Sequence, residues 1–517
     1  MDPPANLPGS RPTGTGRSTE TENRRSVVWM AQPLSRRRVL QGLVAGTGLA
    51  LTGGLSLPTP AGAVRGRSQP VKPPGTRPDP TKPEGVDLLP QIEHIVIYMQ
   101  ENHSFDSYFG MLGRGDGYTL GANGAPTNAN PDAAGNPVRV FHAPDTCQSG
   151  MPVTQSWNAS HQQFDGGRLD GFVRTSGPNA MRYWDGSDIP FYYGLANTFV
   201  LCDRWFGSCL AQTFPNRMYL QAATSLGLIS TDIPKAVALP PPKNGTIWER
   251  LNAHGIPWRD YAWDLPDVAL FPPVFQANQD KVKKFPQFLT DCAAGTLPTV
   301  SIVTPGVDVY NEERPHDIHL GEAYSASVIN AVMHGPAWPK TVVLFMYDEH
   351  GGYYDHVPPP AAIAPDGIPP DIDVPPDQPG GFDRYGFRVP GMVISPFSKK
   401  DYVSHVVHDH TSVLRFIETK FNLGALTYRD ANASDLLDTL DLSGRPAFLD
   451  PPELPAPGLP ASGSRCEKTP APPTGLPTQL ARTGTGVDTL AVAGGAALLA
   501  GAAALAAERR VERAADG

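Results

Sequence analysis

The sequence predicts an α/β fold, with a doubly wound and mostly parallel sheet in a single large domain. Two observations predict it. Strand-like segments are continuous apolar runs, which is typical of strands covered on both faces, and they lie at residues 92–99, 299–305, 341–347 and 389–395. Helix-like patterns separate or follow these runs, at residues 245–255, 323–335 and 411–422. Strands that alternate with helices favour a parallel sheet covered by helices on both faces.

The chain before this domain predicts an export signal within residues 1–63. Three arginines at 36–38 precede an apolar stretch, and Ala61-Gly62-Ala63 has the spacing of a cleavage site. The arginine pair resembles the twin-arginine signal, whose cargo the twin-arginine export machinery moves in folded form. An ordinary secretory signal and a membrane anchor are the alternatives. Translation from Met30 would give a signal of more usual length.

Proline-rich segments flank the domain, a linker at 64–87 and a spacer at 451–479. Residues 480–517 then contain the pentapeptide LARTG, a weakly apolar stretch and a charged tail. This order resembles the LAxTG sorting signals of Gram-positive, actinobacterial-type bacteria, in which a sortase would cut between Thr483 and Gly484 and join the protein to the cell wall. A plain C-terminal membrane anchor is the alternative. Both predict a protein exposed at the cell surface.

Charge and cysteine content exclude two classes of protein. The formal net charge of the whole chain is −9, whereas residues 1–63 have a net charge of +4. The rest of the chain is therefore more acidic than the whole. An acidic body does not neutralise phosphates over a surface, so we expect no nucleic-acid partner. The five cysteines, at 147, 202, 209, 292 and 466, include no CxxC pair and are too few for a disulfide scaffold. Their pairing stays open at this point.

Polar residues follow two of the predicted strands. Glu101-Asn102 comes directly after the first run, and Asp348-Glu349 after the run at 341–347, with histidines close to both. Ligands bind beyond the carboxyl ends of strands in open parallel sheets. Carboxylate and amide oxygens suit Mg²⁺, Ca²⁺ or Mn²⁺, and nearby histidines admit Zn²⁺. The alternative is that these side chains cap the turns that follow.

A nucleophile candidate lies in the middle of the chain. Thr213 precedes the sequence FPNR at an apparent junction between loop and helix. A hydroxyl at a helix N-terminus can lie beside backbone donors that hold a phosphoryl oxygen. The alternative is an ordinary N-cap threonine.

Four blocks of sequence resemble a known family in the same order. They are ENHSFDSYFG (101–110), CDRWFGSCLAQTFPNRMYLQAATS (202–225), YDEHGGYYDHVPPP (347–360) and HDHTSVLRFIETKFNL (408–423). The blocks are similar to the phosphoesterase family of bacterial phospholipases C and acid phosphatases, and to plant non-specific phospholipases C. The resemblance implies an alkaline phosphatase-like fold, with residues 88–450 as the catalytic domain.

The resemblance also implies roles for individual residues. Binding of a divalent metal ion and of phosphate would fall to Glu101, Asn102, Asp348 and Glu349. Thr213 would be the nucleophile and would also face the metal. Asn216 would bind substrate by positioning the phosphoryl group.

The general acid is expected among four histidines, His161, His316, His356 and His410. Two positions depart from the family. Gln155 stands where a histidine is frequent, and Arg314 stands in a stretch that is usually Glu/Asp-His-Pro. Either the arginine replaces a catalytic histidine or His316 serves in a shifted register. His103, where relatives often have arginine, is expected to support the site rather than to catalyse.

These features predict an exported, metal-assisted phosphoesterase. The preferred substrate is a glycerophospholipid, cleaved as by a phospholipase C through a phosphothreonine intermediate. The alternatives are an acid phosphatase acting on phosphate monoesters and a non-catalytic binding protein displayed on the wall. Aromatic residues could cage a choline head group or simply pack the core: Trp157, Tyr183, Trp184, Tyr192 and Tyr193.

Overall fold

The computed structural model describes residues 70–307, 309–373, 375–458 and Cys466. These residues belong to one compact unit, which begins at Gln69. The predicted export signal, the Met30 start and the sorting signal lie outside the described residues. Within the described part of the chain, no helix is both long and apolar enough to cross a membrane.

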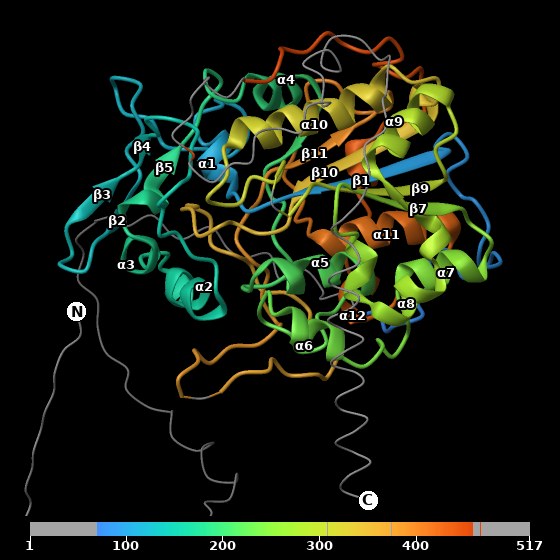
Figure 1. The fold of residues 1–517 in the computed structure, drawn as a ribbon, viewed down its shortest axis with the longest axis horizontal. Coiled ribbons are helices and arrows are strands. Elements are labelled where there is room, and N and C mark those ends of the chain that lie inside the picture. Colours follow the sequence, from blue (N-terminus) through green and yellow to red (C-terminus); the bar gives the residue numbers. More distant parts are fainter. Residues whose placement is uncertain (1–69, 308, 374, 459–465, 467–517) are drawn as a thin grey trace, which may run out of the picture. The chain divides into compact units, whose positions relative to one another are not determined.

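An eight-stranded sheet forms the centre of this unit, in the order β12-β6-β11-β10-β1-β9-β7-β8 (Figure 1). β1 (His94–Gln100) lies between β10 (Thr341–Tyr347) and β9 (Val300–Thr304), and it is parallel to both. Gln100 lies opposite Tyr347, so β1 and β10 end side by side. The predicted runs at 92–99, 299–305 and 341–347 are thereby confirmed as strands.

Strands on both sides complete the sheet. β7 (Trp258–Ala262) and β8 (Val282–Lys284) continue it in parallel beyond β9. On the other side lie β11 (Gly391–Ile394), β6 (Val200–Cys202) and β12 (Val403–Ser404). β11 is antiparallel to both of its neighbours, because a loop connection rather than a helical crossover leads to it from β10. The sheet is therefore mostly parallel but mixed.

Helices cover both faces of the sheet. Figure 1 shows α4, α9 and α10 on one face and α5, α7 and α11 on the other. The bounds of the helices are α1 (Phe105–Phe109), α2 (Trp157–Phe164), α3 (Phe172–Ser176), α4 (Pro190–Thr198), α5 (Thr213–Ala222), α6 (Ile233–Ala238), α7 (Ile247–Ala253), α8 (Pro272–Ala277), α9 (Phe285–Ala294), α10 (Ile318–Met333), α11 (His410–Phe421) and α12 (Tyr428–Ala431). The predicted helices at 245–255, 323–335 and 411–422 correspond to α7, α10 and α11. Two small strand pairs lie outside the main sheet, β2 (Ala129–Pro131) with β3 (Pro137–Arg139) and β4 (Phe141–His142) with β5 (Arg182–Tyr183).

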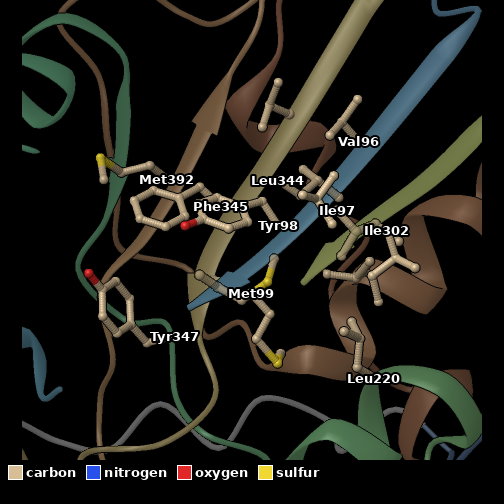
Figure 2. Close-up of a cluster of buried hydrophobic side chains, with 14 of the residues drawn as sticks. Val96, Ile97, Tyr98, Met99, Leu220, Ile302, Leu344, Phe345, Tyr347 and Met392 are labelled. Carbon is tan, nitrogen blue, oxygen red and sulfur yellow. The ribbon is translucent and has the colours of Figure 1, made fainter. Parts of the chain in front are cut away.

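The hydrophobic core lies between the sheet and these helices. Side chains of β1 alternate between its two faces, and Ile97 and Met99 are buried like Tyr98. Figure 2 shows Leu220 of α5 among the side chains at the carboxyl end of β1. Burial of each such side chain contributes roughly 1.5–3 kcal/mol, which holds α5 against this end of the sheet.

The segment before the predicted domain is part of the folded unit. Gly75 donates its N–H to the carbonyl of Ala425 at 2.7 Å. The side-chain amide of Asn422 donates to the carbonyls of Asp79, Lys82 and Pro83. A proline-rich chain offers carbonyls more often than N–H donors, and here one asparagine satisfies three of them. The stretch from residue 70 to 87 is therefore bound to the domain and is not a free linker.

The segment after the predicted domain is also attached. Cys466 forms a disulfide with Cys147, 319 residues earlier in the chain. Gly458 donates its N–H to the buried carboxylate of Glu322 at 2.7 Å. The predicted spacer therefore begins with residues fixed to the domain. The remaining cysteines, Cys202, Cys209 and Cys292, are free and buried.

Candidate active site

The paired ends of β1 and β10 bring the predicted acidic residues together. Asp348 Oδ1 accepts hydrogen bonds from the backbone N–H groups of Asn102, at 3.3 Å, and Glu349, at 2.7 Å. Asn102 adopts a left-handed conformation with φ of 70°. Gly351 packs on it so closely that a Cβ at that position would lie 2.0 Å from the Asn102 carbonyl oxygen. The turn after β10 therefore requires glycine where it meets the turn after β1.

α5 contributes an arginine to this edge of the sheet. Arg217 donates from Nη1 to both oxygens of Asp267, at 3.0 and 3.2 Å, and from Nη2 to Glu101 Oε1 at 3.2 Å. Its Nε lies 3.4 Å from Asp348 Oδ2. The guanidinium thus stands between Glu101 and Asp348, and it is only 3% exposed.

Several buried oxygens of the site have no hydrogen-bond partner among the described residues. They are Asn102 Oδ1, Asp348 Oδ2 and Glu349 Oε1. Leaving a buried polar atom unpaired costs about 1–3 kcal/mol, so such atoms call for an explanation. Carboxylate and amide oxygens of this kind are a donor set that suits a divalent cation.

The charges of the site also fit a cation. Burial and the neighbouring carboxylates raise the pKa of Glu101 and Glu349 well above the usual range, and burial raises that of Asp348 to about 7 despite Arg217. Burial also lowers the pKa of the nearby histidines, His103 and His350 to about 3 and His410 to about 4, so none is protonated at neutral pH. Arg217 is a cation among these carboxylates, and a divalent ion bound beside it would further favour their charged forms.

Thr213 is the first residue of α5 and is 5% exposed. This confirms the predicted junction of loop and helix, although the N-cap is Gln212. Thr213 lies one helical turn before Arg217, so the two side chains share a side of the helix. Thr213 thus lies on the side of α5 from which Arg217 reaches the edge where β1 and β10 end.

Asn216 holds the loop that leads to Thr213. Its Oδ1 accepts from the N–H groups of Ser208 and Cys209, at 2.8 and 3.1 Å. Its Nδ2 donates to the carbonyls of Ala211 and Gln212. Both polar atoms of the amide are engaged with backbone, so Asn216 shapes the loop rather than offering a free group to a substrate.

One of the four predicted histidines contacts this edge, and a second lies on a loop that reaches it through Glu313. His410 begins α11, and its Nε2 lies 2.7 Å from the carbonyl oxygen of Asp348. It is fully buried, and its Nδ1 has no partner among the described residues. His316 lies on the loop at 311–316, with Nδ1 2.7 Å from the Asn311 side chain.

The other two predicted histidines are engaged elsewhere. His161 stacks on Trp157, with ring centroids 4.0 Å apart, and its Nδ1 lies 2.8 Å from the Trp157 carbonyl oxygen. His356 bonds Asp106 at 2.7 Å and lies 3.3 Å from Asp116. The structure therefore does not group all four histidines around Thr213.

His356 belongs to a second acidic cluster, formed by Asp106, Asp355, His356 and Arg388. Ligand atoms of the first three lie within 4.8 Å of one another, which is close enough to hold a metal ion. Arg388 pairs with Asp106 and Asp355, both at 2.9 Å. Burial alone would lower the pKa of His356, but the hydrogen bond and charge of Asp106 raise it to about 9. The cluster is thus an internally paired network.

Glu313 and Asp267 were not predicted as site residues. Gln155 donates to Glu313 Oε1 at 3.0 Å, and Asn102 lies close enough to lower the pKa of Glu313, which burial raises overall. The charge of Glu313 also raises the pKa of Glu101, Asp348 and Glu349. The sequence offered one signal for Glu313, the unusual stretch that contains Arg314. It offered none for Asp267, which follows β7.

The aromatic candidates for a choline cage pack mainly in the core. Trp184 is fully buried, and Tyr192, which is 1% exposed, donates its hydroxyl to the buried carboxylate of Glu312. Trp157 and Tyr183 are also buried, and Tyr193 is half-buried. The core alternative therefore holds for these side chains, with Tyr193 the most accessible.

Comparison with known proteins adds a family match. The model of the Phosphoesterase family matches residues 92–424. Phospholipase C B of Mycobacterium tuberculosis is 31% identical over 436 residues, which cover 72% of this chain and 83% of that protein. Non-specific phospholipase C1 of Arabidopsis thaliana is 30% identical, over 70% of this chain and 74% of that protein.

Two further similarities are more partial. The non-hemolytic phospholipase C of Pseudomonas aeruginosa is 30% identical over 72% of this chain, but the match spans 59% of that protein. Among solved structures, a protein in the alkaline phosphatase superfamily from Vibrio parahaemolyticus is similar with a TM-score of 0.35 and 10% identity, over 70% of this chain and 75% of that chain.

Proposed function

The chain belongs to the phosphoesterase family, whose members hydrolyse phosphate esters, and we propose that it is an exported, metal-assisted phospholipase C. The substrate would be a glycerophospholipid, cleaved on the glycerol side to leave diacylglycerol. Relatives named phospholipase C, from M. tuberculosis and A. thaliana, support this choice. The observation that carries it is the set of unpartnered buried oxygens on Asn102, Asp348 and Glu349, at the edge that α5 faces.

The residues would share the chemistry as follows. Glu101, Asn102, Asp348 and Glu349 would hold a divalent ion, Mg²⁺, Ca²⁺, Mn²⁺ or Zn²⁺, together with the Thr213 hydroxyl. When bound, the ion would polarise a phosphoryl oxygen and favour ionisation of that hydroxyl. Thr213 Oγ1, its proton passed to water, would attack phosphorus in line, and the bond from phosphorus to the glycerol oxygen would break. The product is a phosphothreonine that carries the head group, which water cleaves in a second step.

The leaving alkoxide needs a proton. We place its donor on the loop at 311–316, because this loop carries both His316 and Glu313 and reaches Asn102. His410 is fully buried and bonded to the Asp348 carbonyl, which suits a role in positioning β10 more than contact with a leaving group.

Two substrates and one variant test the proposal. We expect hydrolysis of a phosphocholine ester and much slower hydrolysis of a simple aryl phosphate monoester. The reverse preference would identify an acid phosphatase instead. Thr213→Ala should lower kcat by several orders of magnitude with little change in thermal stability. Full activity of that variant would exclude the covalent mechanism, and Thr213→Ser should retain part of the rate.

We also infer export and attachment to the cell wall, from the arginine pair at 36–37 and the LARTG motif at 480–484. The disulfide between Cys147 and Cys466 supports an oxidising compartment. Fractionation of cells that express Arg36→Lys/Arg37→Lys or Thr483→Ala tests each signal. Retention of the first in the cytoplasm and release of the second from the wall are the expected results.

A further inference from the structure

Arg217 makes contacts of unequal quality with the three carboxylates around it. It forms two hydrogen bonds with Asp267, at 3.0 and 3.2 Å, and one with Glu101, at 3.2 Å. Toward Asp348 it has only a 3.4 Å approach, and neither Arg217 Nε nor Asp348 Oδ2 has a hydrogen-bond partner among the described residues. The arginine is therefore held firmly on one side and loosely on the other.

Asp267 is itself fixed by its surroundings. Its carbonyl accepts from Gln221 Nε2 at 3.0 Å, and Gln221 Oε1 accepts from Trp248 Nε1 at 2.8 Å. Gln221 lies on α5 like Arg217, so the arginine and its anchor are bound to the same helix. Asp267 is also 5% exposed, so water does not replace its contacts. It is suited to retain Arg217 while other partners change.

Glu101 and Asp348, in contrast, are carboxylates to which the proposed function assigns a metal ion. A guanidinium and a divalent cation cannot both saturate the same oxygens at short range. Without any cation, the carboxylates of half-buried Glu101 and buried Asp348 would repel each other when both are charged. Arg217 lowers this repulsion in the metal-free protein, but its presence also costs affinity for the ion.

We propose that Arg217 neutralises Glu101 and Asp348 in the metal-free protein and that a bound metal ion displaces it from both. Asp267 is the positioning residue that retains Arg217 when the ion binds. This inference rests on the metal site of the proposed function. It predicts that Arg217 and the ion compete for these two carboxylates. Asp267 weakens this competition because it holds the Arg217 guanidinium on the other side. Loss of Asp267 would leave Arg217 fully available to Glu101 and Asp348.

Metal affinity of four proteins tests the proposal. Mn²⁺, Ca²⁺ and Zn²⁺, each alone, are titrated calorimetrically into the EDTA-treated and dialysed full domain. Arg217→Gln should bind the ion about tenfold more tightly than the parent, and Asp267→Asn about tenfold more weakly. In the double variant, Asp267→Asn should have almost no further effect, because it acts through Arg217.

The double variant separates competition from general electrostatics. Simple loss of a positive charge in one variant and of a negative charge in the other would also change metal affinity in opposite directions. The two changes in binding free energy would then add in the double variant. Additivity therefore overturns the proposal, as does a change of the same sign in both single variants. Where Arg217→Gln does not fold, Arg217→Lys replaces it, since lysine keeps the charge but cannot bridge three carboxylates. The affinity of the Arg217→Lys variant for the metal ion should then exceed that of the parent protein.

Arg388→Gln is the matched control, because Arg388 is a buried arginine that bridges two aspartates of the second cluster. It should lower Tm and leave Mn²⁺ affinity unchanged; if it does not fold, His356→Gln takes its place. A shift in metal affinity in either control would overturn the local mechanism. Absence of binding in the parent would overturn the inference as well, whereas hydrolysis of the phosphocholine ester decides the proposed function separately.

Discussion

Two buried acidic clusters lie in this domain, and each contains one arginine between two carboxylates. In the second cluster, every oxygen of Asp106 and Asp355 accepts a hydrogen bond, from Arg388, His356 or backbone N–H groups. In the cluster at the ends of β1 and β10, one oxygen of each acid, Asp348 Oδ2 and Glu349 Oε1, accepts none within the described residues.

The charges differ in the same way. His356, with a raised pKa, and Arg388 oppose Asp106 and Asp355, whereas Arg217 is shared by Glu101, Asp348 and Asp267. Proximity of carboxylates alone thus does not identify a metal site. Carboxylate oxygens without hydrogen bonds are the further feature that supports the proposed metal site at the ends of β1 and β10.

The largest expected effect comes from Asp348→Asn. It should lower kcat by about a hundredfold or more, because it removes a carboxylate from the proposed ion. It should not lower the free energy of unfolding of the metal-free protein, since it removes one of several carboxylates that share Arg217 and keeps the acceptor at Oδ1. Steady-state kinetics and urea unfolding in EDTA measure the two effects. A marked loss of stability would place Asp348 in a balanced network like the second cluster.

Asp355→Asn is the same chemical change in the second cluster, and it should have the opposite result. It leaves Arg388 short of a charged partner in a fully buried position, which costs about 3–5 kcal/mol of unfolding free energy. Urea unfolding checks this value. A loss of less than about 1 kcal/mol would show that the paired network contributes little to stability. The proposed difference between the two acidic clusters would then not hold.

The smallest effect is a pH dependence in the second cluster. The pKa of His356 is raised from 6.5 to about 9, so its pairing contributes fully below pH 6.5 and is lost as pH rises through about 9. The parent should exceed His356→Gln in unfolding free energy by about 1–3 kcal/mol at pH 6, and this difference should shrink by pH 10. A difference that is constant with pH would show that His356 is neutral in the folded protein.

Local patterns made part of this structure predictable. The apolar runs that became β1 and β10 needed burial on both faces, and Pro215 close to Thr213 marked the start of α5. The site residues that follow β1 and β10 could therefore be assigned to one edge. Such predictions depend on neighbours in sequence and on one rule about parallel sheets.

Residues brought in from distant segments were not predictable in this way. Asp267 reaches Arg217 only because β7 lies in the same sheet as β1, two strands away. His356 follows Glu349 closely in sequence, but Gly351 and Gly352, with φ of 65° and 82°, turn the chain toward Asp106 instead. Sequence proximity therefore suggested one site where the fold makes two.

The disulfide between Cys147 and Cys466 also has a mechanical consequence. Any pull on the C-terminus reaches Cys466 before it reaches Gly458, and the covalent bond carries it to Cys147. The hydrogen bond between Gly458 and Glu322 is then spared the load. Because Cys147 is bridged to Asp317 at the start of α10, such a load would enter the fold at this bridge and not through Glu322.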